Sequence, residues 1–300
     1  MNHTKKMGSI SSKILFVLLL LSTIVKAQEP IGLMSDNYMP SSSILYNPAS
    51  LFTSPVKWDL NFLSADVFFY NNLAYAEHSS VLTLLGNLTI KEAAFNKPNT
   101  IRGFTNATVQ GPSIVFHHSS FSFGITTQVR SGTSIVSKQV PSNLDFNNLV
   151  EDSLYQFPQS KAAGMNWMQI GVHLGKSIIT SGKYQVYSAI NINYLAGWDG
   201  IAATTEQSVD FLKHSINDTI SFAQVEMNYA YTSGFSNDLQ QNLTAMQFKG
   251  SGAGVDVGIW ITDDNDPLEY KWKAGVSLID VGVISFSKNV QQYQLVTQEP

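Results

Sequence analysis

The sequence predicts an all-β protein and, within that class, an antiparallel transmembrane β-barrel with short helices in its extracellular loops. Long runs alternate apolar and polar residues with a period of two, which is the period of a strand and not of a helix. The connections between these runs alternate between short and long, and an export signal precedes them all. Bacterial outer-membrane barrels have short periplasmic turns and longer extracellular loops.

Residues 1–27 are predicted to be a cleavable signal peptide. A basic region that ends at Lys13 is followed by an apolar run over residues 14–25, and small residues near its end predict cleavage after Ala27. An N-terminal membrane anchor is the alternative, but the apolar run is well short of the roughly 20 residues that a spanning helix needs. We therefore expect the mature chain to be exported to the outer membrane.

Composition excludes several functional classes. Charged residues make up 13% of the chain, about half the share that is usual in soluble domains. The formal net charge of −4 gives no indication of nucleic-acid binding. The chain has no cysteine, which excludes disulfide scaffolds, thiolate metal sites and cysteine catalysis.

The barrel is expected to occupy residues 56–300, with seven long strands. The clearest pair lies within residues 250–282, where Val255, Val257 and Ile259 share one face of the first strand. Its runs of about ten residues match the length of a tilted strand that crosses a bilayer. The other expected strands cover residues 56–70 (with a bulge near 64–66), 111–116, 121–129, 166–178 and 184–198.

The connections set the expected orientation of the strands. Short turns at 117–120, 180–183 and 263–268 are placed on the periplasmic side. The long connections are expected to contain short helices at 81–88, 143–154 and 208–216. An odd number of strands does not close a bacterial barrel. Either 220–231 and 290–296 supply further strands, or the chain is the front part of a longer barrel, which is the interpretation we favour.

The segment between the signal peptide and the first strand, residues 28–55, contains the tripeptide Asn47-Pro48-Ala49. This element resembles the N-terminal region of FadL-like outer-membrane proteins, which include long-chain fatty-acid transporters and barrels of the type nine secretion system. Residues 57–63 and 275–280 are closest to an uncharacterised outer-membrane family with a domain of unknown function. The resemblance implies that residues 28–55 lie in the periplasm or plug the barrel.

The resemblance also implies a function, namely the uptake of a hydrophobic small molecule by binding and passage, without a cofactor. The alternative is a non-catalytic outer-membrane module that binds or assembles an exported protein. The expected partners are outer-membrane lipid and either that small molecule or that protein. No enzyme is expected, since no catalytic Ser/His or carboxylate pair stands out. The paired histidines at 117–118 and the acidic run at 263–266 are interpreted as turn residues and not as metal ligands.

Polar residues that alternate with apolar ones along the strands are the candidate functional side chains, because the interior of such a barrel is polar. These lumen-facing candidates are Gln128, Arg130, His173, Asn191, Asn193, Asp256, Lys271 and Lys273. The glycines at 250, 252 and 254 continue a strand and do not open a helix, which argues against a nucleotide-binding loop. They are expected to be wall residues that let the barrel curve or let a plug approach.

Overall fold

The computed structural model is an all-β protein, with two short helices among the residues that it describes. It describes residues 37–76, 93–95, 98–138, 150–179, 184–214, 219–232, 247–263 and 270–297. All of its strand pairs are antiparallel. The all-β antiparallel class predicted from the period-two alternation is therefore confirmed.

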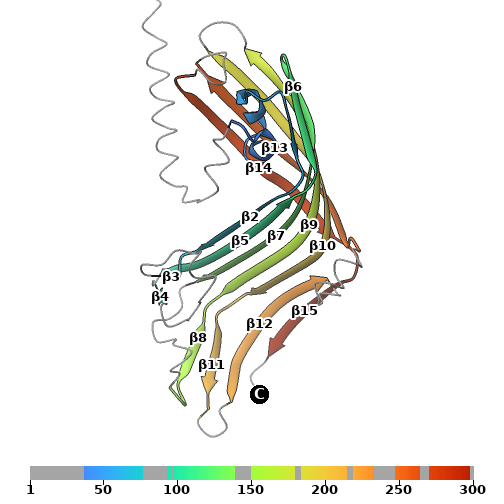
Figure 1. Ribbon diagram of the computed structural model, residues 1–300. Helices are drawn as coiled ribbons and strands as arrows, with labels where there is room; N and C mark the ends of the chain where they lie inside the picture. The colour runs from blue at the N-terminus through green and yellow to red at the C-terminus, as the bar shows by residue number, and fades with distance from the viewer. Residues whose placement is uncertain are drawn as a thin grey trace, which may run out of the picture.

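Three long strands form the centre of the main sheet. They are β7 (Phe121–Lys138), β9 (Ser160–Ile179) and β10 (Gln185–Thr205), and they pair in that order. All three run through a bend that divides the sheet into two halves, which Figure 1 shows as an upper and a lower part. The edges of the two halves are built from different strands.

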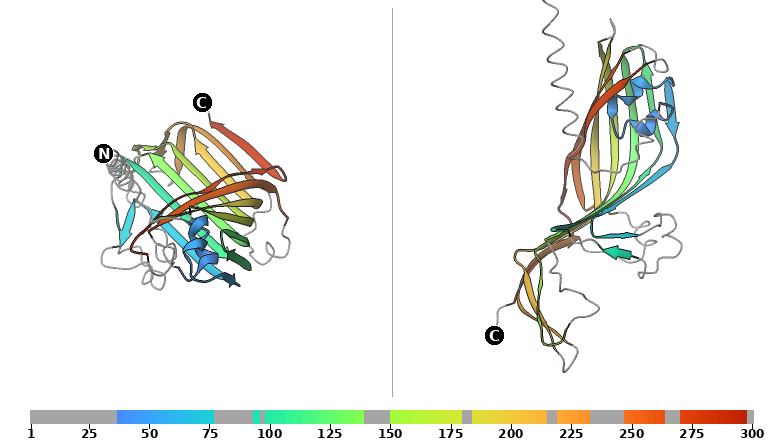
Figure 2. Two further views of the ribbon diagram at one scale, coloured as in Figure 1. Left: turned by 90° about the horizontal axis from the view of Figure 1, so that it is seen from above. Right: turned by 90° about the vertical axis from the view of Figure 1, so that its left-hand side faces the viewer.

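The half that carries the helices extends the central strands on both sides. β6 (Ser113–His118) and then β1 (Trp58–Asn61) follow β7 on one side. β13 (Gly250–Thr262) and then β14 (Lys273–Phe286) follow β10 on the other side. This half curves around α3 (Pro40–Ser43) and the 3-10 helix η1 (Pro48–Thr53), as Figure 2 shows.

The other half has its own edge strands. β5 (Thr100–Gln110) and then β2 (Ser64–Asn71) follow β7 on one side, and β12 (Ile220–Thr232) and then β15 (Val290–Thr297) follow β10 on the other. β11 (Val209–Lys213) and β8 (Leu154–Phe157) continue from β12. β3 (Ala74–Ala76) and β4 (Ala93–Phe95) form a separate two-stranded sheet.

The bend lies where strands break or change partners. β5 ends before Gly111-Pro112 and β6 begins after it, since proline cannot donate a ladder hydrogen bond. β10 pairs with β13 as far as Gly197 and with β12 from Ile201. A buried ion pair, Lys249 Nζ to Asp199 Oδ1 at 2.5 Å, lies at this branch point. The ion pair thus links Lys249, the residue directly before β13, to the middle of β10.

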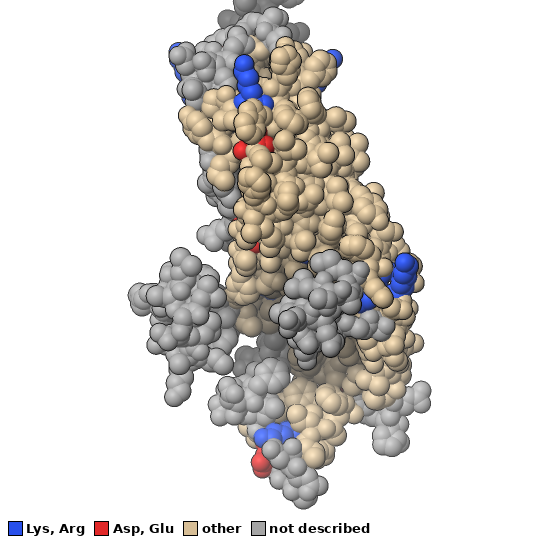
Figure 3. Space-filling model, turned by 45° about the vertical axis from the view of Figure 1, so that its right-hand side comes forward, with Lys and Arg blue, Asp and Glu red and all other residues tan. Residues whose placement is uncertain are grey.

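The two faces of the sheet differ in chemistry. We call the face that packs on α3 and η1 the inner face and the opposite one the outer face. Along β7, Ser122, Gly124 and Thr126 are buried on the inner face, whereas Phe121 and Phe123 are exposed on the outer one. Few Lys, Arg, Asp or Glu side chains interrupt the surface in Figure 3.

Most of the predicted strands are confirmed. The expected bulge in the first strand is the break between β1 and β2, and β12 and β15 match the weaker runs at 220–231 and 290–296. The helix expected at 208–216 is wrong, because β11 lies there and packs Phe211 on Tyr155 of β8. The expected helix at 81–88 and residues 143–149 of the next lie outside the described residues.

The long connections predicted after the strands 56–70 and 121–129 are shorter in the structure, because parts of them are strand. β5 fills 100–110, β7 continues to Lys138, and β9 already begins at Ser160. These extensions pair directly with one another, so main-chain hydrogen bonds hold them despite a weak side-chain pattern. β7, with 18 residues, is consequently about twice its predicted length, and β9, with 20, is about half as long again as predicted.

The described strands form an open curved sheet and not a closed barrel. β1 pairs only with β6 and β14 pairs only with β13, so the two edges of the helix-bearing half do not meet within the described residues. The transmembrane barrel therefore stays a prediction. In the parts of the chain that are described, no helix combines the length and apolar character needed to cross a bilayer.

Candidate functional site

The N-terminal segment, which we define as residues 37–55, is seated on the inner face. Every residue from Pro40 to Ser54 is buried except Leu45 and Tyr46, which are partly exposed. Isolated helices of four and six residues are unstable in water. Packing against the sheet therefore holds α3 and η1 in place.

Asn47 connects this segment to the sheet. Its Oδ1 accepts a hydrogen bond from the Ala49 N–H at 2.9 Å and caps η1, while Pro48 occupies the first helical position. Its Nδ2 donates to the main-chain oxygens of Ile259 (3.3 Å) and Val276 (3.4 Å). The Asn47-Pro48-Ala49 motif is thus a helix start that also binds two neighbouring strands.

Replacing Asn47 with alanine should weaken this seat without unfolding the sheet. The variant loses the cap and the two bonds to β13 and β14, which together contribute about 1–3 kcal/mol. We expect faster chymotrypsin cleavage within residues 37–55 and little change in far-ultraviolet circular dichroism. Met39→Ala is the control, because the Met39 side chain is exposed and makes no capping hydrogen bond; equal cleavage rates in the two variants would contradict the role of Asn47.

A buried polar cluster on three strands lies under the segment. Asp256 accepts hydrogen bonds from Asn193 Nδ2 (2.8 Å), Asn191 Nδ2 (3.3 Å) and the Asp280 main-chain N–H (2.7 Å). Asn191 Nδ2 also donates to the Ile44 carbonyl oxygen at 3.1 Å. The side-chain amide of Asn191 therefore links the cluster to Ile44, the residue that ends α3.

His173 extends the cluster toward Ser122. Its Nδ1 lies 2.8 Å from Asn191 Oδ1, and its Nε2 lies 2.9 Å from Ser122 Oγ. A hydroxyl, an imidazole and an orienting amide in this order occur in nucleophilic sites. Here the three side chains are at most 3% exposed, and none of them borders the cavity described below. They act as a hydrogen-bonded support for the segment.

An ion pair crosses the inner side of the sheet. Arg130 of β7 binds both carboxylate oxygens of Asp280 in β14, at 2.5 and 2.8 Å, although β9, β10 and β13 separate these strands. Asp280 has a φ of 59° beside a bulge in the β13–β14 ladder, and this conformation turns it toward Arg130. The guanidinium also lies 5.0 Å from the ring centre of Trp167.

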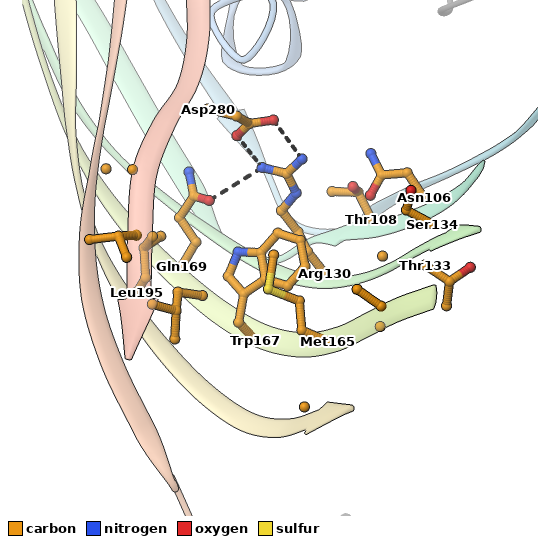
Figure 4. A pocket seen from close by; sticks show the side chains of 18 of the residues that line it. Asn106, Thr108, Arg130, Thr133, Ser134, Met165, Trp167, Gln169, Leu195 and Asp280 are labelled. Carbon is orange, nitrogen blue, oxygen red and sulfur yellow. Dashed lines mark hydrogen bonds and ion pairs between the residues drawn. The ribbon is translucent and has the colours of Figure 1, made fainter. Parts of the chain in front are cut away.

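A cavity of about 600 Å³ lies between the N-terminal segment and the bend of the sheet. Leu45 and Tyr46 border it from the segment. Figure 4 shows Trp167, Met165 and Leu195 on one side of Arg130, and Asn106, Thr108 and Ser134 on the other. The volume is typical of small-molecule sites, and the lining combines an apolar wall with a few polar groups.

The structure distributes the sequence-predicted residues between the segment and the cavity. Gln128, Arg130, Asn193 and Asp256 line the cavity, and His173 and Asn191 lie under the segment. Lys273 reaches the segment, with Nζ 2.6 Å from Asn37 Oδ1.

The prediction that Lys271 faces the lumen is wrong. Lys271 was expected in a strand and on the inner face, but it precedes β14 and is exposed, with its main-chain N–H bound to Asp263 Oδ1 at 2.8 Å. The carboxylate of Asp263 competes for that N–H, so the ladder begins only at Lys273.

Three residues of the site were not predicted. Asp280, Trp167 and Asp66 all border the cavity, and none of them is among the lumen-facing candidates named from the sequence. The sequence does carry a signal for Asp280, because the exposed apolar residues change from even to odd positions around it. Val276 and Leu278 share the outer face, and the apolar set continues at Val281 and Val283. A bulge of this kind turns the residue between the two sets inward.

The glycines at 250, 252 and 254 continue the strand β13, as expected, but the glycine beside the N-terminal segment is Gly258, four residues beyond Gly254. A Cβ at Gly252 would overlap the main chain of β14, whereas one at Gly258 would overlap the Asn47 side chain and lie 2.8 Å from Pro48 Cδ. Between the segment and β13 there is therefore no room for a side chain at Gly258. In the described parts of the chain, no group of three or more His, Cys, Asp or Glu residues could hold a metal ion.

Comparison with known proteins identifies a family without an assigned activity. Residues 48–299 match the model described as "Family of unknown function (DUF5723)", which covers all of the described strands and η1. No curated protein matches the chain, and no solved structure does. The comparisons give no match to FadL-like or type nine secretion proteins, so that narrower resemblance stays a prediction.

Proposed function

The chain belongs to this family of unknown function, and we propose that it forms the wall of an outer-membrane β-barrel that takes up a hydrophobic small molecule. In this proposal the outer face of the sheet contacts lipid, and the N-terminal segment fills part of the interior. The ligand binds in the cavity between that segment and the bend. The mechanism is binding and passage without covalent chemistry.

The observation that carries the proposal is the inverted polarity of the helix-bearing half. Its inner face is polar and buried, and its outer face exposes large apolar side chains from neighbouring strands. These are Phe121, Phe123, Ile125, Ile170, Val172, Leu174, Ile192, Tyr194, Val257, Ile259, Val276 and Leu278. A continuous apolar outer surface with a polar interior is the pattern of outer-membrane barrels.

Strand length supports the same proposal. β9 has 20 residues and β10 has 21, whereas about 9–11 tilted residues suffice to cross a bilayer. Half of each strand is therefore enough to span the membrane. The other half, beyond the bend, would extend the wall into the aqueous phase.

A binding or assembly module for an exported protein is the second candidate. It is favoured by the depth at which residues 40–54 are buried, since a firmly seated segment would obstruct passage. It is also favoured by β15, of which every residue except the last is exposed. Uptake remains our first proposal because the cavity is adjacent to the segment and is lined by both apolar and polar groups.

Cell fractionation and gel mobility test the proposal. The protein should be recovered in the outer-membrane fraction and should migrate faster before boiling than after it, because folded barrels resist detergent. Recovery in the soluble periplasmic fraction, with no change of mobility on boiling, would overturn it. Uptake and assembly are then distinguished by whether the purified protein retains a small amphiphile or a protein.

A further inference from the structure

We propose that the cavity accepts an amphiphile whose head group donates hydrogen bonds and carries no negative charge. This inference rests on the proposed function and names the ligand class of the same site. It follows from the charges around the cavity, from the polar atoms left without partners, and from where the apolar side chains lie.

The charged lining of the cavity is acidic. Among the described residues that border it, Asp66, Asp256 and Asp280 are opposed only by Arg130. Arg130 is already bound by both oxygens of Asp280, so it is not a free cation. Repulsion between like charges is strong in a site partly screened from water. A carboxylate or phosphate head would therefore meet an excess of negative charge.

The unpartnered polar atoms indicate what the head group offers. Asn106 Oδ1 and Arg130 Nε are buried and have no hydrogen-bond partner. Asp66 has no hydrogen bond or ion pair to any residue that the structure describes. Two of these three groups are acceptors; Asp66 is partly exposed, whereas buried atoms such as Asn106 Oδ1 normally find partners. A hydroxyl or ammonium group would donate to the acceptors, and a hydroxyl could also accept from Arg130 Nε.

Strand register places these groups together. Asp66 lies opposite Thr108, and Thr108 lies opposite Arg130, so the three form a row across β2, β5 and β7. Asn106 is two residues from Thr108 and shares its face of β5. The row forms the polar side of the cavity, while Met165, Trp167 and Leu195 form an apolar side for an acyl chain (Figure 4).

Three probes with chains of the same length test the inference. The full chain, purified in amphipol, is equilibrated with an equimolar mixture of monododecanoylglycerol, dodecylamine and dodecanoate. The bound molecules are then extracted and quantified by mass spectrometry. We expect either non-anionic probe to exceed dodecanoate by at least about tenfold. Asp66→Asn, which removes one charge and keeps an acceptor, should reduce that ratio.

A variant with a filled cavity measures how much of each probe is retained outside the cavity. Gly254 borders the cavity, and a Cβ there would make ordinary contacts, the shortest 3.5 Å to Leu195 Cδ1, so Gly254→Leu should fill the space. Gly103 does not border the cavity and has nothing within 4 Å of an added Cβ, so Gly103→Leu is the matched control. Retention should fall in the first variant and stay unchanged in the second.

The outcomes separate the inference from the proposed function. If dodecanoate is retained as well as or better than the other probes, the inference is overturned while the cavity remains a binding site. If the wild-type protein retains none of the probes above the level of Gly254→Leu, both the inference and the proposed uptake function are overturned.

Discussion

Gly258→Ala is expected to displace the N-terminal segment from the inner face. The added Cβ would overlap the Asn47 side chain and lie 2.8 Å from Pro48 Cδ and 2.9 Å from Pro48 N. The proline ring cannot rotate away, so η1 must shift and the two bonds from Asn47 Nδ2 must break. Displacement of η1 also removes the Phe52 ring from Tyr187, on which it stacks at 5.1 Å.

Chymotrypsin sensitivity measures this displacement, because Tyr46 and Phe52 lie within the segment. Gly254→Ala is the matched control, since it is the same substitution on the same face of β13 and its nearest contact would be 3.5 Å. Cleavage in the segment should become at least about tenfold faster in Gly258→Ala, because losing its contacts shifts the local opening equilibrium by about 1.4 kcal/mol or more. Equal rates in the two variants would show that the segment does not depend on close approach to β13.

Asp256→Ala should cause the largest loss of stability of any single change in the site. It leaves Asn193 Nδ2 and the Asp280 main-chain N–H without an acceptor and removes one of the two acceptors of Asn191 Nδ2, in a place where Asp256 itself is 4% exposed. It also removes one of the two carboxylates near Arg130. Unsatisfied buried donors cost about 1–3 kcal/mol each, so we expect a total loss of at least about 3 kcal/mol.

The midpoint of urea unfolding measures this loss. Asp256→Asn keeps one carbonyl acceptor and should lose less stability than Asp256→Ala. Asp210→Ala is the control, because among the described residues the Asp210 side chain bonds only to Gln156, by an exposed hydrogen bond of 3.0 Å. That control should change stability by less than about 0.5 kcal/mol. If Asp256→Ala resembled Asp210→Ala, the buried cluster would not be the support that we describe.

Alternation predicted the central part of the sheet because one face of each strand there is chemically different from the other. In β9, Ile170, Val172 and Leu174 face outward while Gln169 and His173 face inward. A one-residue shift would exchange these sets, so the register is strongly specified. The parity rule therefore found the strands and also identified which polar side chains share the inner face.

The same rule failed where both faces of a strand have similar surroundings. In β5, Thr105, Asn106, Ala107 and Thr108 are all partly buried, and no alternating pattern distinguishes them. Pairing with β2 and β7 holds this strand, and that information lies in distant parts of the chain. The true length of the strands therefore could not be read from the local sequence.

The site was predictable in part. The Asn47-Pro48-Ala49 motif indicated the segment that is seated on the inner face, but its contacts with Gly258, Ile259 and Val276 join residues more than 200 positions apart. The ion pair between Arg130 and Asp280 joins residues 150 positions apart across three intervening strands. Contacts of this kind depend on curvature of the whole sheet, which no short pattern in the sequence encodes.

The claim that the outer face lies in lipid can be tested most directly by spin labelling, since the chain has no cysteine of its own. Single cysteines replace Ile170, Val172 and Leu174 on the outer face of β9, and Leu154 at the far end of the sheet serves as the aqueous control. The labelled proteins are reconstituted in bilayers and exposed to oxygen or to a water-soluble nickel chelate.

The account predicts that oxygen relaxes the three β9 labels strongly and the nickel chelate weakly, because oxygen concentrates in lipid and the chelate is excluded from it. The label at Leu154 should show the opposite preference. If the nickel chelate relaxed the β9 labels as effectively as the label at Leu154, the outer face would be in water, and the proposed membrane wall would be wrong.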